Sequence, residues 1–351
     1  MQAYAPDIRE EKHIMKKKTG IYLFTAVAAA AAVSVTGIGI KNVRASRSGA
    51  ESTAPSSEST GTKLKVVASF YPMADFAQKV GGDQVEVTNM VPAGTEPHDW
   101  EPSAKDIKNL ENSDVFVYNG AGMEHWAEDI LESLDNKDIV VVEASKGLEL
   151  LKGSSHEEEG EAEDGHEEES EDGHDHGDTD PHVWLAPENA KKEMENIKNG
   201  LEEADADHKD VYEKNYETWS QEFDKLDQEF KDGLADSKTK NVITAHEAFG
   251  YLCKAYGLTQ MGIEGLTPDS EPDPDRMEEI IKFAQKNDVK TIFFEELVSP
   301  KVAETIASEV GAETAVLNPL EGLTDEEIKD GEDYFSVMRE NLKALEKALN
   351  Q

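Results

Sequence analysis

Three histidines are the residues of this chain whose type and placement best suit metal chemistry, namely His98, His182 and His246. His98 follows a predicted strand, and His246 stands at the carboxyl end of another. Ligands of open α/β sheets bind in the crevice beyond the carboxyl ends of strands, so we expect the three side chains to converge across a cleft. Three imidazole nitrogens suit zinc and leave a fourth position for a carboxylate or a water.

Each histidine taken alone has an ordinary alternative, which is a loop side chain that is exposed or hydrogen-bonded. The residues beside them favour the metal interpretation. Pro97, Pro181 and Pro187 stiffen the loops, and a stiff loop loses less entropy when its ligands are held in place.

The elements that must position these side chains alternate between strand and helix in both halves of the chain. Predicted strands lie at 64–70, 84–91, 115–118 and 139–142, and again at 242–244, 260–263, 289–294 and 314–317. Helical patterns lie between them, and the last helix is predicted at 334–349. This alternation is typical of mostly parallel sheets covered by helices. A chain of 351 residues has room for two such α/β lobes.

One long helix is predicted at 207–236, between the two series. Its apolar side chains recur at steps of four and three, at Tyr212, Tyr216, Trp219, Phe223, Leu226, Phe230 and Leu234. A helix of this length can form a rigid spine between lobes. The alternative is a helix that packs within one lobe.

The segment 153–180 interrupts the first series. It contains four histidines and fourteen Asp or Glu, and it has no Lys or Arg. Such a composition cannot bury apolar surface, so we predict a disordered loop. Two roles remain open for it, which are a solvated spacer and a weak zinc collector beside the main site.

The first 45 residues read as an export signal or a membrane anchor. Lys16, Lys17 and Lys18 precede an uncharged, mostly apolar run at 21–40. Residues 46–62 are rich in Ser, Thr, Gly and Pro, and they read as a flexible tether. We therefore expect the rest of the chain to lie outside the cytoplasm.

Bulk composition excludes some classes of function. The formal net charge is −40, which argues against nucleic acid as a partner and is compatible with cations as ligands. The chain has one cysteine, Cys253, so neither an internal disulfide nor a cysteine-based zinc cluster can form. We expect Cys253 to be a small core residue.

Four segments together resemble one family, the metal-binding receptors of bacterial ABC transporters (cluster A-I substrate-binding proteins), zinc branch. They are 70–73 (FYPM), 96–102 (EPHDWEP), 180–185 (DPHVWL) and 246–252 (HEAFGYL). The acidic, histidine-rich segment just before the second histidine is also typical of that branch. The resemblance implies two Rossmann-like lobes, at 63–206 and 237–351, joined by one long helix with zinc between them. It also implies delivery of zinc to an importer's membrane permease with its ATPase, by a monomeric receptor.

The resemblance implies four metal ligands. The first three are His98, His182 and His246. The fourth is an acidic residue on a C-terminal loop, and it matches Glu321 in the segment 317–323 (LNPLEGL). Glu295 and Glu296, which end a predicted strand, compete with Glu321 for this role, as does a water.

Two other functions compete with a transport receptor. The first is a zinc hydrolase, but Gly250 stands where the second histidine of a His-Glu-x-x-His motif would be. The second is a surface adhesin with the same fold. Most Gram-positive members of the zinc branch are lipoproteins with a cysteine just after the signal. This chain has no cysteine before Cys253, so we expect a transmembrane anchor or free secretion.

Overall fold

The structure is a computed structural model that describes residues 62–153, 179–268 and 272–351, all within one compact unit, Thr60–Gln351. The predicted export segment and nearly all of the tether lie outside these residues. So does the acidic segment apart from its ends. Within the described ranges, no helix combines the length and apolar content needed to cross a bilayer.

The first lobe is built on a parallel sheet with the strand order β2-β1-β3-β4. Its strands are β1 (Leu64–Ala68), β2 (Val85–Asn89), β3 (Val115–Tyr118) and β4 (Val140–Glu143). Its helices are α1 (Tyr71–Gly81), α2 (Ala104–Glu111), α3 (Ala127–Ser133) and α4 (Pro187–Ala204), with the short 3₁₀ helices η1 (Gly82–Gln84), η2 (Val183–Leu185) and η3 (Ala206–His208). Both faces of the sheet are covered, which explains the nearly continuous apolar runs of its central strands.

The second lobe repeats this plan, with a parallel sheet in the order β6-β5-β7-β8. Its strands are β5 (Asn241–Thr244), β6 (Thr259–Gly262), β7 (Thr291–Phe294) and β8 (Glu313–Val316). Its helices are α6 (Gly250–Tyr256), α7 (Pro274–Lys286), α8 (Lys301–Val310), α9 (Asp325–Asp330) and α10 (Tyr334–Leu349). The two lobes therefore share one strand order.

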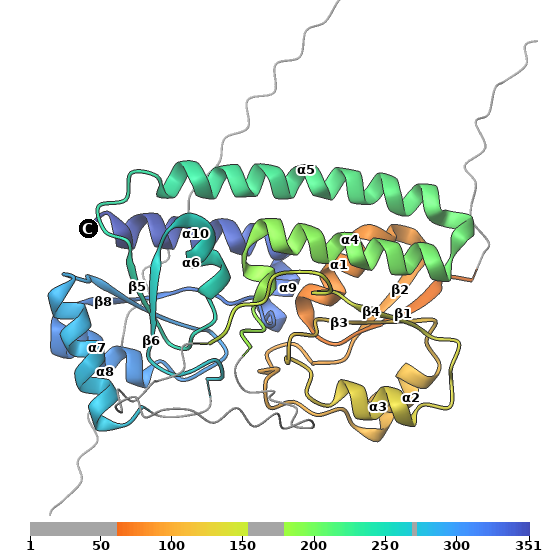
Figure 1. Cartoon of the computed structure of the whole chain (residues 1–351), viewed down its shortest axis with the longest axis horizontal. Coiled ribbons are helices and arrows are strands. Elements are labelled where there is room, and N and C mark those ends of the chain that lie inside the picture. The colour runs from red at the N-terminus through yellow and green to blue at the C-terminus, as the bar shows by residue number, and fades with distance from the viewer. Residues whose placement is uncertain (1–61, 154–178, 269–271) are drawn as a thin grey trace, which may run out of the picture. The chain divides into compact units, whose positions relative to one another are not determined.

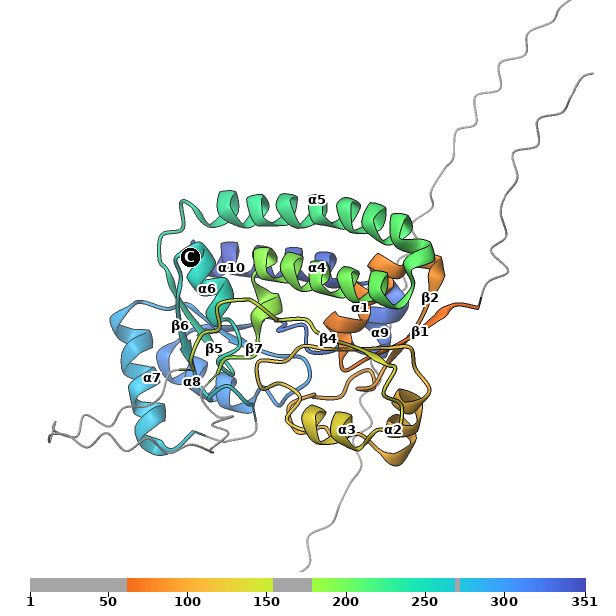
Figure 2. The same ribbon diagram turned by 45° about the vertical axis from the view of Figure 1, so that its right-hand side comes forward.

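The long helix α5 (Lys209–Leu234) connects the two sheets, as predicted. It packs on α1 and α4 of the first lobe and on α6 and α10 of the second (Figure 1). Figure 2 shows α5 lying along α4 and α10, with the helix pairs α2–α3 and α7–α8 at opposite ends. The chain is thus an α/β protein of two Rossmann-like lobes joined by one long helix.

The largest apolar cluster runs through both lobes, beside a smaller separate cluster in each. Phe76 of α1 and Phe223 of α5 both meet Tyr334 of α10, with ring centroids 5.1 and 5.5 Å apart. The Tyr334 hydroxyl donates to the carbonyl of Trp184 at 2.7 Å. Because side chains of both lobes share this core, the lobes meet through packed contacts and not only through the linking helix.

Most predicted elements agree with the structure to within a few residues. The start of α2 is fixed by a capping box between Ser103 and Asp106. Two helices were not predicted, α4 and α9. The apolar positions of α4 do recur at helical spacing, at Ala190, Met194, Ile197 and Leu201, but charged residues surround them and Gly200 interrupts the pattern.

Candidate metal centre

His98 lies on the loop that leaves β2. Its backbone N–H donates to the Glu96 carboxylate at 2.9 Å, and a turn between Pro97 and Trp100 closes the loop. The imidazole Nε2 lies 3.2 Å from Nε2 of His182 and 3.2 Å from Oε1 of Glu321. Local hydrogen bonds within the loop therefore aim this side chain at residues far away in the sequence.

His182 directly precedes η2, and its side chain is completely buried. Asp180 accepts two hydrogen bonds from it, from the backbone N–H at 2.9 Å and from the ring Nδ1 at 2.8 Å. A buried carboxylate on Nδ1 fixes the ring orientation and leaves the lone pair of Nε2 as the free donor.

His246 stands two residues beyond the end of β5 and is also completely buried. Its carbonyl accepts from the Thr244 hydroxyl at 2.7 Å and from the Gln260 amide at 3.3 Å. Its ring Nδ1 lies 2.5 Å from the carboxylate of Glu295. In two of the three histidines, Nδ1 therefore contacts a carboxylate. Metal-binding histidines usually have such a hydrogen-bonding partner on the ring nitrogen that does not bind the metal.

Glu321 follows a strained turn of the second lobe. Leu320 has a left-handed φ of 57°, and its N–H donates to the Asn318 side chain at 2.7 Å. The side-chain amide of Asn341 in turn donates a hydrogen bond to the backbone carbonyl of Asn318 at 2.7 Å. This brings the carboxylate of Glu321, which is only 2% exposed, between the two lobes.

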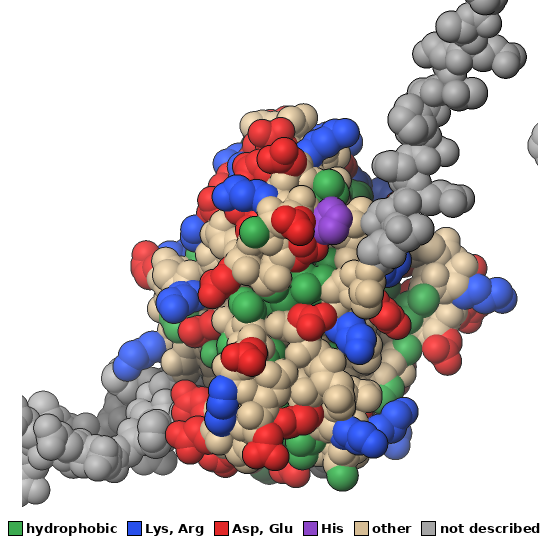
Figure 3. All heavy atoms as spheres, turned by 90° about the vertical axis from the view of Figure 1, so that its right-hand side faces the viewer, with side chains coloured by type: hydrophobic (Ala, Val, Ile, Leu, Met, Phe, Trp, Pro, Cys, Tyr) green, Lys and Arg blue, Asp and Glu red, His purple; other side chains and the backbone are tan. Residues whose placement is uncertain are grey.

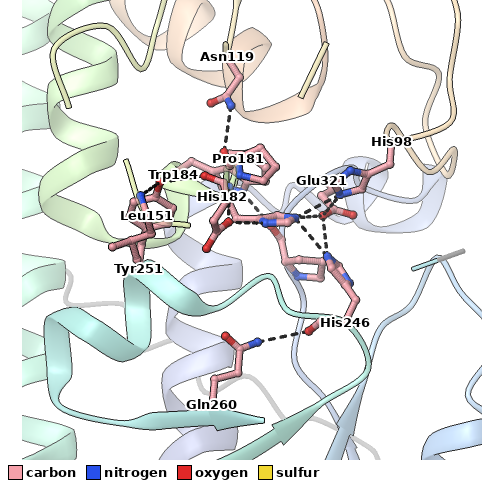
Figure 4. A network of polar contacts seen from close by, with 12 residues as sticks. His98, Asn119, Leu151, Pro181, His182, Trp184, His246, Tyr251, Gln260 and Glu321 are labelled. Carbon is pink, nitrogen blue, oxygen red and sulfur yellow. Dashed lines mark hydrogen bonds and ion pairs between the residues drawn. The ribbon is translucent and has the colours of Figure 1, made fainter. Parts of the chain in front are cut away.

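The four side chains meet around one point (Figure 4). Oε1 of Glu321 lies 3.2, 3.0 and 3.2 Å from Nε2 of His98, His182 and His246. All four candidate ligand atoms lie within 4.8 Å of one another. Ligands at about 2.0–2.1 Å from a tetrahedral zinc stand ~3.3 Å apart, so the spacing suits that ion. Within the described ranges this is the one cluster of its kind.

The electrostatics of the group favour a bound cation. Burial lowers the pKa of His246, but the charges of Glu295 and Glu321 outweigh it and hold that pKa well above its usual range. Burial also lowers the pKa of His182, and hydrogen bonds to Asp180 and Glu321 raise it overall. Conversely, burial raises the pKa of Glu321, but the nearby histidines hold it well below its usual range. The carboxylate of Glu321 thus stabilises positive charge at His182 and His246.

The two competitors for the fourth position lie elsewhere. Glu295 binds the outer nitrogen of His246, on the side away from the convergence point. Glu296 accepts from the Asn318 amide at 2.9 Å, and burial together with the neighbouring Glu327 carboxyl raises its pKa to about 7. The structure therefore brings Glu321 together with the three histidines, and it does not bring Glu296 there.

Sequence reasoning missed Asp180 as a residue that orients a histidine, and it treated Glu295 mainly as a competing ligand. Asp180 precedes His182 by two residues, and that spacing was a usable signal because Asp side chains often bond backbone two residues on. Glu295 gave no such signal, because it is 49 residues from His246. Cys253 is buried, as expected.

Comparison with known proteins identifies close relatives. The model of a family described as zinc-uptake complex component A, periplasmic, matches residues 66–348. The high-affinity zinc uptake system protein ZnuA of Bacillus subtilis is 45% identical over 302 residues, which cover 86% of this chain and 92% of that protein. The zinc-binding lipoprotein AdcA of Streptococcus pneumoniae is longer, and the matched region spans 56% of its length.

Solved structures match as well. The Zn(II)-bound ZnuA-like domain of Streptococcus pneumoniae AdcA has a TM-score of 0.69 at 39% identity, covering 83% of this chain and all of that one. The laminin-binding protein Lmb of Streptococcus agalactiae, described as bifunctional with adhesin and metal-transporting activity, has a TM-score of 0.69 at 35% identity. That match covers 82% of this chain and 99% of Lmb.

Proposed function

Because the chain belongs to the zinc-uptake complex component A family, we propose that it is an extracytoplasmic receptor that binds zinc with high affinity and delivers it to an ABC-type importer. The observation that carries the proposal is the convergence of three imidazole nitrogens and one carboxylate oxygen at a buried point between the lobes. We assign His98, His182, His246 and Glu321 as the zinc ligands. Nitrogen-rich donor sets favour zinc over the oxygen-preferring divalent cations.

The zinc is cargo in this proposal and takes part in no reaction. The family is one of substrate-binding receptors rather than enzymes. A catalytic zinc keeps one position open for water, whereas four side-chain ligands fill a tetrahedral zinc. Gly250 also stands where the second histidine of the hydrolase motif would be. Both points favour binding over hydrolysis.

The partners follow from the same proposal. The receptor acts as a monomer outside the cytoplasm and docks on a membrane permease that works with an ATPase. Residues 1–45 direct its export or anchor it in the membrane.

The test is a chelator-competition titration of the purified chain with zinc, followed by an ester and peptide hydrolysis assay on the same zinc-loaded sample. We expect one tight site and no turnover above that of free zinc. The double variant His98→Ala/His182→Ala is the control and should lose the tight site. Tight binding that survives in the control, or clear hydrolytic turnover, would contradict the proposal.

A second candidate function is adhesion at the cell surface. The observation that favours it is the similarity to Lmb, whose description includes adhesin activity. If this chain is also an adhesin, immobilised laminin should bind it saturably. The His98→Ala/His182→Ala variant should bind laminin equally well if adhesion does not use the zinc site.

A further inference from the structure

Tyr251 forms a bridge between the lobes beside the metal centre. It belongs to α6 of the second lobe and is 4% exposed. Its hydroxyl accepts from the backbone N–H of Leu151 at 2.9 Å and donates to the carbonyl of Asp180 at 2.8 Å. Both partners lie between β4 and η2 of the first lobe, so one hydroxyl holds two backbone segments of the other lobe together (Figure 4).

The segment that Tyr251 holds is the one that presents His182. The backbone N–H of Asp180 donates to the Leu151 carbonyl at 2.9 Å, so the backbone segments around these two residues lie side by side. The Asp180 carboxylate orients the His182 ring through Nδ1. A displacement of the Asp180 backbone would therefore move the carboxylate and, with it, the imidazole.

The fit between α6 and Asp180 is close. Gly250 immediately precedes Tyr251, and a Cβ placed on Gly250 would lie 2.6 Å from Oδ2 of Asp180. Only a residue without a side chain lets α6 approach the carboxylate this closely. The position of α6 relative to Asp180 is thus defined by a steric contact as well as by the hydroxyl.

The two backbone carbonyls that precede His182 are each bound by a side chain of a different lobe. Tyr251 of the second lobe binds the carbonyl of Asp180, and Asn119 of the first lobe binds the carbonyl of Pro181 at 3.0 Å. His182 is therefore fixed with reference to both lobes at once. His246 lies five residues before Tyr251 in the same lobe, so the bridge relates two candidate ligands from opposite sides of the cleft.

We propose that Tyr251 is a positioning residue of the zinc site, whose hydroxyl sets the place of His182 relative to His246 by fixing the Asp180 backbone across the lobes. This inference rests on the proposed zinc-binding function. Outer partners of metal ligands typically contribute 10–100-fold in affinity. Loss of the hydroxyl leaves the ring packing in place and removes both hydrogen bonds.

The experiment compares Tyr251→Phe with Tyr256→Phe in the full chain. Tyr256 lies on the same helix, and its hydroxyl binds Asp227 of α5 at 3.2 Å, away from the metal centre. Three quantities are measured for each: the zinc Kd by chelator competition, the visible spectrum of the Co²⁺-loaded protein, and the urea stability of the metal-free protein. The Co²⁺ spectrum reports ligand geometry, which a loss of general stability does not change.

We expect Tyr251→Phe to raise the zinc Kd by about 10-fold and to alter the Co²⁺ bands, while Tyr256→Phe changes neither. Gly250→Ala adds a methyl group that presses on Asp180 from the same helix, so it should raise the zinc Kd and alter the Co²⁺ bands as Tyr251→Phe does. If Tyr251→Phe does not fold, Gly250→Ala is used to test the inference in its place. An unchanged Kd and spectrum in the folded variants would overturn the inference. Equal effects of Tyr251→Phe and Tyr256→Phe would overturn it too. If the wild-type chain itself binds no zinc, the proposed function fails instead.

Discussion

At the scale of single residues, two carboxylates outside the ligand cluster determine which ring nitrogen of His182 and His246 is available to bind a metal. Asp180 and Glu295 each bind the Nδ1 of one histidine, so the lone pairs of Nε2 turn towards the Glu321 carboxylate. Neutral imidazoles that face one another in this way repel unless a proton or a cation lies between them. The geometry therefore suits a site in which zinc and protons compete.

The first prediction follows from that competition. The carboxylates of Glu295 and Glu321 hold the pKa of His246 well above its ordinary value of 6.5, so we expect the metal-free site to keep a proton above that pH, which zinc must displace. Zinc affinity should therefore fall as pH falls, beginning above about 6.5 and not only below it. Calorimetry of zinc binding in buffers of different ionisation enthalpy at pH 7.5 measures the protons released. Binding without proton release would contradict this.

The histidines of the site were predictable from the sequence, whereas the residues that orient them were not. His98, His182 and His246 stand out because they follow strand ends or lie between prolines. Glu321 was reached only through the resemblance to a family. Glu295 was named as a competitor of Glu321, and its contact with Nδ1 of His246 could not be predicted because it depends on the neighbouring placement of β5 and β7 in the sheet.

At the scale of elements, α4 is the helix that sequence reasoning missed, and its unusual residues explain why. Gly200 lies in its interior, where a Cβ would come within 2.1 Å of Cγ2 of Val142 on β4. Glu193 is completely buried, and neither of its carboxyl oxygens has a hydrogen-bonding partner within the described residues. A glycine and a glutamate at inward positions weaken an amphipathic pattern. By contrast, α5 and α10 have longer apolar stripes despite the buried Asp227 and Asn341, and both helices were predicted.

The second prediction concerns Gly200→Ala. In an exposed helix interior this change stabilises by about 1 kcal/mol, but here the new methyl group meets a stiff, buried valine. We expect a net loss of about 1–2 kcal/mol in the free energy of unfolding, measured with urea. The double variant Gly200→Ala/Val142→Ala should lose less than the sum of the single variants. A stabilised Gly200→Ala would show that α4 does not press on β4.

The third prediction concerns Glu193→Gln. Burial, together with the nearby charge of Glu124, raises the pKa of Glu193 well above its ordinary value of 4.5. The folded chain therefore keeps a proton that the unfolded chain loses, and this costs stability as pH rises above 4.5. Glutamine stays neutral, so the variant should gain stability relative to the wild type by an amount that grows with pH. We expect little difference at pH 4.5 and a clear gain in the free energy of unfolding of the variant at pH 8. A difference that does not vary with pH would argue against this.

At the scale of the whole molecule, the shared core and the linking helix keep the lobes together around the site. Lys79 of α1 binds Asp333 at the start of α10 at 2.9 Å and lies over the Trp219 ring of α5 at 4.8 Å, so charge as well as packing connects the lobes. On the face seen in Figure 3, acidic and basic side chains are interspersed. The segment 153–180 holds fourteen Asp or Glu and no Lys or Arg, so it contributes −14 to the formal net charge of −40.

The two-lobed α/β class was predictable because strand and helix patterns alternate twice. The identical strand order of the sheets was not, because it depends on which strands pair in space. The two halves reach that order with different side chains, such as Val66 at the centre of one sheet and Ile243 at the centre of the other.

The fourth prediction concerns the acidic segment. Its ends are joined by a bridge between Lys152 and Thr179, beside the segment that presents His182. Deletion of residues 154–178 should leave the tight zinc site nearly intact and remove additional weak zinc equivalents, as expected for a collector that raises the local zinc concentration. Chelator-competition titration of the intact and deleted chains makes the comparison. If both bind the same number of zinc ions, the segment is a spacer.

The central claim is that His98, His182, His246 and Glu321 together bind one zinc ion. X-ray absorption spectroscopy of the chain loaded with one equivalent of zinc tests it most directly, with Glu321→Gln as the matched variant. We predict four light ligands at about 2.0–2.1 Å, with the multiple-scattering pattern of three imidazoles and no sulfur. Glu321→Gln should keep the imidazole pattern and change the oxygen shell. A wild-type spectrum with fewer than three imidazoles, or one that Glu321→Gln leaves unchanged, would contradict the account.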